Sequence, residues 1–135
     1  MASGSPQLGH LEGGLLNRAQ LGLLERGYSL STGARDILTH CVIQGAQTMR
    51  LSGEPQSPEV ERARASIDKL VDEISREAKA EQQRLRDQQR GRGFLDKLSE
   101  KIIYTDEQRV TILTIEGNLV SSVMAKLCPG FWPFC

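Results

Sequence analysis

The clearest pattern of hydrophobic and polar positions lies in the middle of the chain, where it predicts a long helix over residues 58–90. Ser57 is a good N-cap residue, and Pro58 suits the first helical position. Glu59 and Glu61 then place negative charge in the first turn, where the helix dipole favours it. Apolar residues recur at steps of three and four, which is the spacing of one helix face. They are Val60, Ala63, Ile67, Leu70, Val71, Ile74, Ala78 and Leu85.

The same stripe has the form of a coiled coil for about two heptads. Val60, Ile67 and Ile74 recur every seven residues, and Leu70 lies between them. We therefore expect these four residues to pack, as knobs into holes, against a partner helix or a second copy of the chain. Residues 81–90 are almost wholly polar, and we expect them to project into water or to meet a partner.

The first part of the chain predicts two weaker helices, a first one that is short and frayed and a second one over about 31–51. Glycine is frequent here, and each glycine inside a helix costs roughly 1 kcal/mol relative to alanine. Residues 1–12 are expected to be disordered. The apolar face of the first helix would consist of Leu15, Leu16, Ala19, Leu23 and Leu24.

The last part of the chain supports two interpretations. Residues 94–103 fit a short amphipathic helix, and a seven-residue stripe through 110–127 predicts another. However, residues 109–115 are rich in β-branched side chains, and Glu116–Asn118 would turn a β-hairpin spanning 109–124. We favour the helix because the stripe is interrupted only at Gly117.

These elements predict an all-α fold, a small helical bundle or hairpin with one long charged helix. Breaks at 52–57 and 91–93 are rich in glycine, proline, serine or arginine and separate three segments of a single helical domain over 13–127. The length of 135 residues fits one domain.

Residues 128–135 form an unusual tail that holds the sole tryptophan and two of the three cysteines. Its aromatic residues Phe131, Trp132 and Phe134 would either fold back to close the core or anchor the chain to a partner groove or a membrane interface. Acylation of Cys128 or Cys135 would strengthen a membrane anchor.

Charge and composition exclude several classes of function. The chain has 17 basic and 17 acidic residues, so no overall field attracts it to nucleic acid. Arg84, Arg86, Arg90 and Arg92 form a weak basic feature, but Glu81 and Asp87 lie among them. Nucleic-acid binding is therefore not favoured.

The residues that would carry catalysis or bind a metal are also sparse. The three cysteines include no Cys-x-x-Cys pair, and the two histidines are 30 positions apart. His40 and Cys41 are sequence neighbours, which on a helix point about 100° apart. We expect no enzymatic activity, no cofactor and no metal.

The sequence thus predicts a cytoplasmic, non-enzymatic interaction, scaffold or adaptor protein that acts through its coiled-coil-like helix, with itself or a partner helix. The alternative is a peripheral membrane protein held by its C-terminal tail. Liposome flotation with and without residues 128–135 distinguishes the two.

Overall fold

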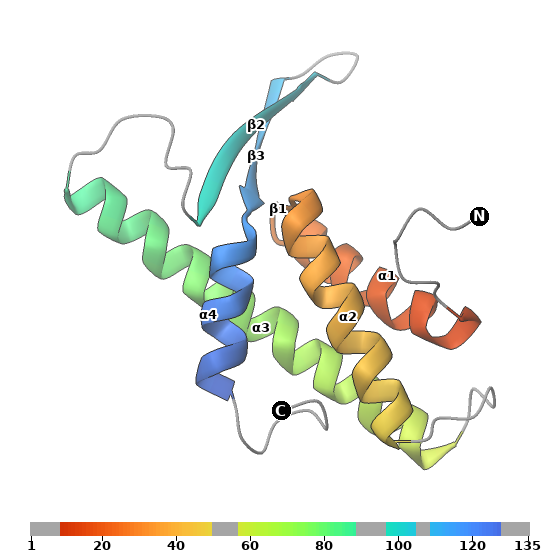
Figure 1. Cartoon of the computed structure of the whole chain (residues 1–135). Coiled ribbons are helices and arrows are strands. Elements are labelled where there is room, and N and C mark those ends of the chain that lie inside the picture. Colours follow the sequence, from red (N-terminus) through yellow and green to blue (C-terminus); the bar gives the residue numbers. More distant parts are fainter. Residues whose placement is uncertain (1–8, 50–56, 89–96, 105–108, 128–135) are drawn as a thin grey trace.

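The computed structural model of the chain describes residues 9–49, 57–88, 97–104 and 109–127 (Figure 1). Within these ranges, four helices account for most of the residues and three short strands form a small sheet. In chain order the elements are α1 (His10–Glu25), β1 (Tyr28–Leu30), α2 (Thr32–Met49), α3 (Pro58–Asp87), β2 (Leu98–Tyr104), β3 (Arg109–Ile115) and α4 (Gly117–Leu127).

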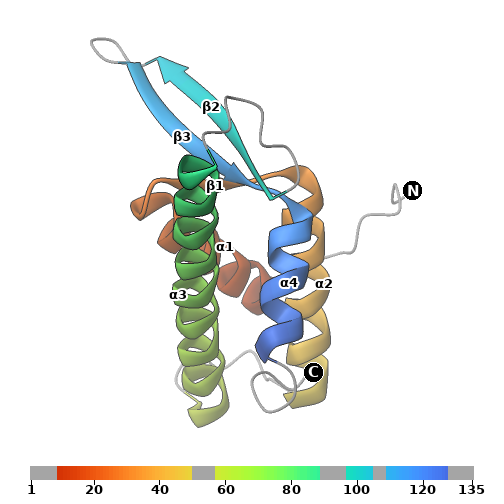
Figure 2. The ribbon, with the colours of Figure 1, turned by 90° about the vertical axis from the view of Figure 1, so that its left-hand side faces the viewer.

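The four helices surround a common core. Helix α1 packs against α2 and α3, and α4 packs against the same two helices. Figure 2 shows α3, α4 and α2 standing upright, with α1 crossing behind them and the sheet lying across one end. Apolar side chains from all four helices and from the strands meet in one continuous cluster.

The sheet has the order β1-β3-β2, so β3 lies in the middle. Strand β1 runs parallel to β3, while β2 and β3 form an antiparallel hairpin. Both views show this hairpin running past the ends of the helices (Figures 1 and 2). At its base, Leu98 and Ile115 are paired and fully buried, which attaches the hairpin to the core.

The long helix predicted over 58–90 is confirmed as α3. Its N-cap is Ser57, whose hydroxyl accepts a hydrogen bond from the Val60 amide at 3.3 Å. Every apolar residue of the predicted stripe is buried. The stripe faces α1 and α4 of the same chain, so the burial that the pattern predicts takes place within one molecule.

The C-terminal end of α3 is less detached than its polar sequence predicts. Leu85 is buried, and Gln82 accepts a hydrogen bond from the Tyr28 hydroxyl at 2.9 Å. Glu81 is largely buried and contacts Lys97 at 3.8 Å and also Arg84. Glu81, Gln82 and Leu85 therefore belong to the packed molecule, while residues 83, 84, 86 and 87 are exposed, as the polar sequence predicts. Residues 89 and 90 lie outside the described part of the chain.

Both N-terminal helices are present, and the first is longer than predicted. Helix α1 starts at His10, so residues 10–12 of the segment expected to be disordered are helical, while residues 1–8 lie outside the described part. Helix α2 matches the predicted 31–51 closely. Strand β1, between the two helices, has no counterpart in the sequence prediction.

The helix predicted over 94–103 is wrong where the structure describes it, because Leu98–Tyr104 form strand β2. A short segment with apolar residues at 98, 102 and 103 fits a helix by spacing alone. However, Ile102, Ile103 and Tyr104 are β-branched or aromatic, and pairing with β3 decides between the two. Residues 94–96 fall outside the described ranges.

Neither interpretation of 109–127 is right over its whole length. The β-branched half is strand β3, and the chain becomes helical at Gly117, where a hairpin turn was the alternative. Strand β3 pairs with β2, which precedes it, and residues 119–124 are helical. The chain is thus mostly helical, as predicted, with an additional three-stranded sheet.

Candidate interaction surface

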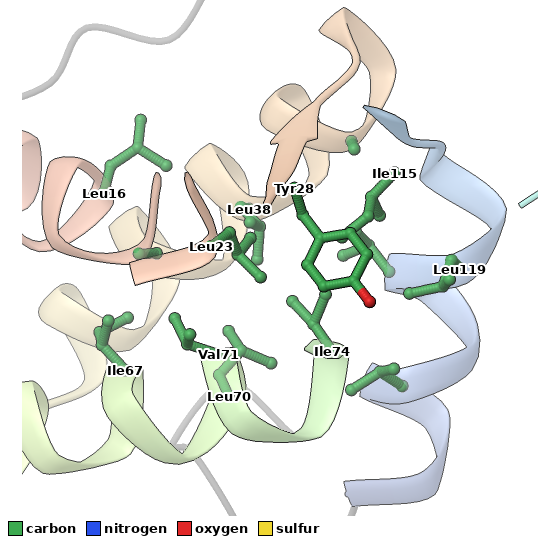
Figure 3. Close-up of a cluster of buried hydrophobic side chains, with 14 of the residues drawn as sticks. Leu16, Leu23, Tyr28, Leu38, Ile67, Leu70, Val71, Ile74, Ile115 and Leu119 are labelled. Carbon is green, nitrogen blue, oxygen red and sulfur yellow. The ribbon is translucent and has the colours of Figure 1, made fainter. Parts of the chain in front are cut away.

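The four residues of α3 that the sequence selects for contact with a partner lie inside the molecule. Val60 and Ile74 are 0% exposed, and Ile67 and Leu70 are 1% exposed. Figure 3 shows Ile67, Leu70 and Ile74 pointing from α3 into the cluster formed with α1, β1 and α4. These side chains offer no surface to a second molecule in this conformation. The tail residues Phe131, Trp132 and Phe134 lie outside the described part of the chain.

Exposed apolar surface occurs instead on α1. Among the residues whose side chains the structure describes, which excludes 101–104 and 109–110 of the hairpin, the large hydrophobic side chains that remain exposed are Leu21 and Leu24, each at 50%. They are three residues apart, so they lie on one face of the helix. We call this pair the leucine face. The opposite side of α1 buries Leu15, Leu16, Ala19 and Leu23.

A hollow lies beside Leu24, between α1 and the adjoining strand. We call it the β1 hollow; its volume is about 210 Å³. All three residues of β1 line it, together with one residue of α2 and two of α1. The lining consists of Gln20, Leu24, Tyr28, Ser29, Leu30 and Arg35.

A second, wider hollow lies beside Leu21, between α1 and α3, and is bridged by ion pairs. Arg18 donates two hydrogen bonds of 2.8 Å to the carboxylate of Asp68, and Arg26 donates one of 2.8 Å to Asp72. The Arg18 hydrogen bonds lower the pKa of Asp68, and the carboxylate in turn raises the pKa of Arg18. The charges around Leu21 are therefore largely matched within the chain.

Close approach of α1 to α3 is required for these contacts, and Gly22 permits it. A Cβ atom at this position would lie 3.1 Å from Cγ1 of Val71 on α3, which is tighter than ordinary contact. The glycine thus lets the two helices approach at the point where the ion pairs cross.

A separate cluster of charged residues connects α3 to the elements that follow it. Lys126 of α4 donates a 2.5 Å hydrogen bond to Glu77, and this contact lowers the pKa of Glu77. Lys97 lies 4.0 Å from the same carboxylate. These cations favour the ionised form of Glu77, which suits this carboxylate to join α3 to α4 rather than to transfer protons.

In the part of the chain that the structure describes, the groups with nucleophilic or metal-binding chemistry are not brought together. Burial raises the pKa of the Cys41 thiol, which makes the thiolate harder to form. In the described ranges, no three His, Cys, Asp or Glu side chains converge in a way that would hold a metal ion. No described helix is both long enough and apolar enough to cross a membrane.

Sequence reasoning missed the leucine face in part. It placed Leu24 on the buried side of the first helix and did not single out Leu21. The available signal was the helical spacing, since Leu21 and Leu24 lie off the stripe formed by Leu15, Ala19 and Leu23.

Comparison with known proteins adds no relative from which a function can be inferred. A scan against models of known protein families finds no match. Comparisons with curated proteins and with solved structures likewise find none.

Proposed function

We propose that this chain is a non-enzymatic protein-interaction module that binds its partner through the leucine face of α1. The observation that carries the proposal is the pair of half-exposed leucines between two hollows. Single exposed apolar residues are normal on protein surfaces, but adjacent ones next to concave surface are typical of binding sites. Removing apolar area from water contributes about 25 cal/mol per Å² to binding, before the entropic costs of association are subtracted.

This proposal keeps the interaction function expected from the sequence but changes the surface. Contact through Ile67, Leu70 and Ile74 would require α1 and α4 to separate from α3, because these residues are at most 1% exposed. Such an opening would expose most of the core to water. Binding at the leucine face requires no rearrangement.

The test compares the full chain with a Leu21→Ser/Leu24→Ser variant. Both proteins are immobilised, proteins retained from an extract of the source cells are quantified by mass spectrometry, and each retained protein is purified and titrated by calorimetry. We expect the variant to bind at least tenfold more weakly, which corresponds to about 1.4 kcal/mol. Equal affinity for both proteins would exclude the leucine face as the contact.

A matched control changes two exposed positions on α3, as Arg62→Ser/Lys79→Ser. These side chains lie outside both hollows. The control variant should bind like the unaltered chain, and circular dichroism should give the same helical signal for all three proteins.

The membrane alternative rests on the tail, which lies outside the described residues. It stays a prediction, and liposome flotation with and without residues 128–135 tests it independently of the leucine face.

A further inference from the structure

Strand β1 lies at one edge of the sheet and pairs with β3 on one side only. The Gly27 carbonyl accepts a hydrogen bond from the Leu113 amide at 3.3 Å, and the Ser31 amide donates one of 2.9 Å to the Ile115 carbonyl. In a parallel pair, alternate residues direct their main-chain groups to the same neighbour. Tyr28 and Leu30 therefore direct their N–H and C=O groups away from β3.

These outward main-chain groups have no hydrogen-bond partner among the described residues of the chain. The Tyr28 side chain leaves the plane of the sheet and points into the core between α3 and α4 (Figure 3). Its hydroxyl is fixed by Gln82. Tyr28 is only 4% exposed and Leu30 is half-buried, so an approaching chain would meet the backbone of β1 at this edge chiefly at Leu30. Unpaired strand edges bind extended segments.

The β1 hollow lies along this same edge, because all three residues of the strand line it. Its volume of about 210 Å³ is below the roughly 300–1,000 Å³ of pockets that hold cofactors or drug-sized ligands. It suits a single aliphatic side chain, which would contact Leu24 and the half-buried Leu30.

Arg35, close to the end of the strand, favours a negatively charged group on a bound chain. Its main chain is used locally, since its amide donates to Ser31 and its carbonyl accepts from the Thr39 hydroxyl. Its exposed guanidinium has no acidic partner within the described part of the chain, whereas Arg18 and Arg26 are both paired. A carboxylate on a bound chain would supply that partner.

We propose that β1 is a docking strand for an extended peptide of the partner, which adds to the sheet edge, places one aliphatic side chain in the β1 hollow and directs a carboxylate to Arg35. The inference rests on the proposed interaction function and specifies its partner. The main-chain edge selects an extended segment rather than a helix. The hollow and Arg35 select an aliphatic residue close to an acidic one.

The experiment selects phage-displayed random linear peptides on the immobilised full chain and measures a fluorescent synthetic copy of the most enriched peptide by polarisation. We expect enriched sequences to carry Asp or Glu within a few residues of Leu, Ile or Val. Arg35→Glu should weaken binding at least tenfold, and Arg62→Glu, on α3 outside the hollow, should not. Binding of the peptide should slow the hydrogen exchange of the Tyr28 and Leu30 backbone amides.

A pair of variants at Leu30 tests the main-chain contact itself. Leu30→Pro removes an N–H that points away from β3, so it spares the bonds made by Gly27 and Ser31. Leu30→Ala loses similar apolar contact but keeps the N–H. Leu30→Pro should therefore weaken the peptide at least tenfold more than Leu30→Ala does.

Each other outcome overturns a defined part of the proposal. If Leu21→Ser/Leu24→Ser weakens binding of the peptide, but the Tyr28 and Leu30 amides still exchange fast in the complex, then strand addition is excluded and the leucine face is kept. If binding of the peptide depends on Arg35 and Leu30 but not on Leu21 and Leu24, the leucine face and the proposed contact with Leu24 in the β1 hollow are both excluded, and only the addition of the peptide to the strand is kept. If the chain self-associates and this protects the β1 amides from exchange without any added peptide, then a second copy of the chain binds the strand, and the assignment of a peptide is overturned.

Discussion

The stripe on α3 and the leucine face on α1 are built from the same kind of side chain but have opposite environments. Ile67, Leu70 and Ile74 are at most 1% exposed, whereas Leu21 and Leu24 are half exposed. The two surfaces belong to neighbouring helices that pack against each other. Apolar spacing therefore does not by itself identify a contact surface for a partner.

The difference reflects what each surface does for folding. The α3 stripe runs along a 30-residue helix, and its burial is needed to offset the conformational entropy lost when that helix is ordered. Helix α1 already buries four residues on its inner side, so its two outer leucines are not required for the core. Apolar residues beyond those that the core uses are the better candidates for binding.

The largest expected effect is a stability contrast between the two surfaces. Ile74→Ala should lower the free energy of unfolding by about 2–5 kcal/mol, because the side chain is fully buried. Leu24→Ala should change it by no more than about 0.5 kcal/mol. Urea unfolding at two protein concentrations measures both values. If Ile74→Ala changes the molecular mass measured by light scattering but leaves the free energy of unfolding unchanged, the contrast between the two surfaces is contradicted.

The end of α1 provides a second test, in which two glycines should respond with opposite signs. Gly27, which leads into β1, has φ +87° and no atom near its missing Cβ, so Gly27→Ala should cost about 1–2 kcal/mol through backbone strain alone. Gly14 lies within α1 with equally open space, and Gly14→Ala should stabilise by about 0.4–1 kcal/mol. Thermal unfolding of both variants measures the contrast, and equal signs would contradict it.

The sequence was sufficient for α3 because the determinants of this helix are local. Its cap at Ser57, its acidic first turn and its stripe all lie within the helix or directly before it. The strands depend on distant partners instead: β1 pairs with residues 113–115, which are 85 positions further along the chain. Leu98, Ile102 and Ile103 fit both a helix and a strand over so short a segment, and the pairing that decides between the two is not a local property.

The candidate site was harder to predict for a related reason. Helix α1 carries leucines on both its sides, and which side faces α3 depends on the packing of the whole bundle. Likewise, the free edge of β1 exists only because β3 occupies its other edge. The lack of a partner for Arg35 among the described residues is equally a property of the fold.

A smaller effect is expected where β1 joins α3. Tyr28→Phe removes the hydrogen bond to Gln82 but keeps the buried ring, so it should cost about 0.5–1.5 kcal/mol. The urea dependence of unfolding should keep its slope, because the folded surface hardly changes. The control is Gln82→Ala, which removes the same bond from the other side. An additive double variant would show that the two side chains are not coupled.

The smallest expected effect concerns the ion pair that joins the leucine-bearing helix to α3. Arg18 and Asp68 are about half exposed, so removing the pair with Arg18→Met should cost only about 0.2–1 kcal/mol at neutral pH. The pKa of Asp68 is lowered below 3.8 by the Arg18 hydrogen bonds, so the folded state binds its proton less readily than the unfolded state. The contribution is therefore present at pH values above 3.8 and is lost as the pH falls through the lowered pKa.

Urea unfolding across this pH range measures the effect. Acid should lower the free energy of unfolding less for Arg18→Met than for the unaltered chain. The control is Arg62→Met, which removes an exposed arginine of α3 that has no ion pair to a described residue. This variant should lose as much free energy of unfolding in acid as the unaltered chain does. In about 1 M salt, where screening shortens to roughly 3 Å, the difference between Arg18→Met and the unaltered chain should shrink. Identical acid profiles for all three proteins would show that the Arg18–Asp68 pair makes no contribution to the stability of the contact between α1 and α3.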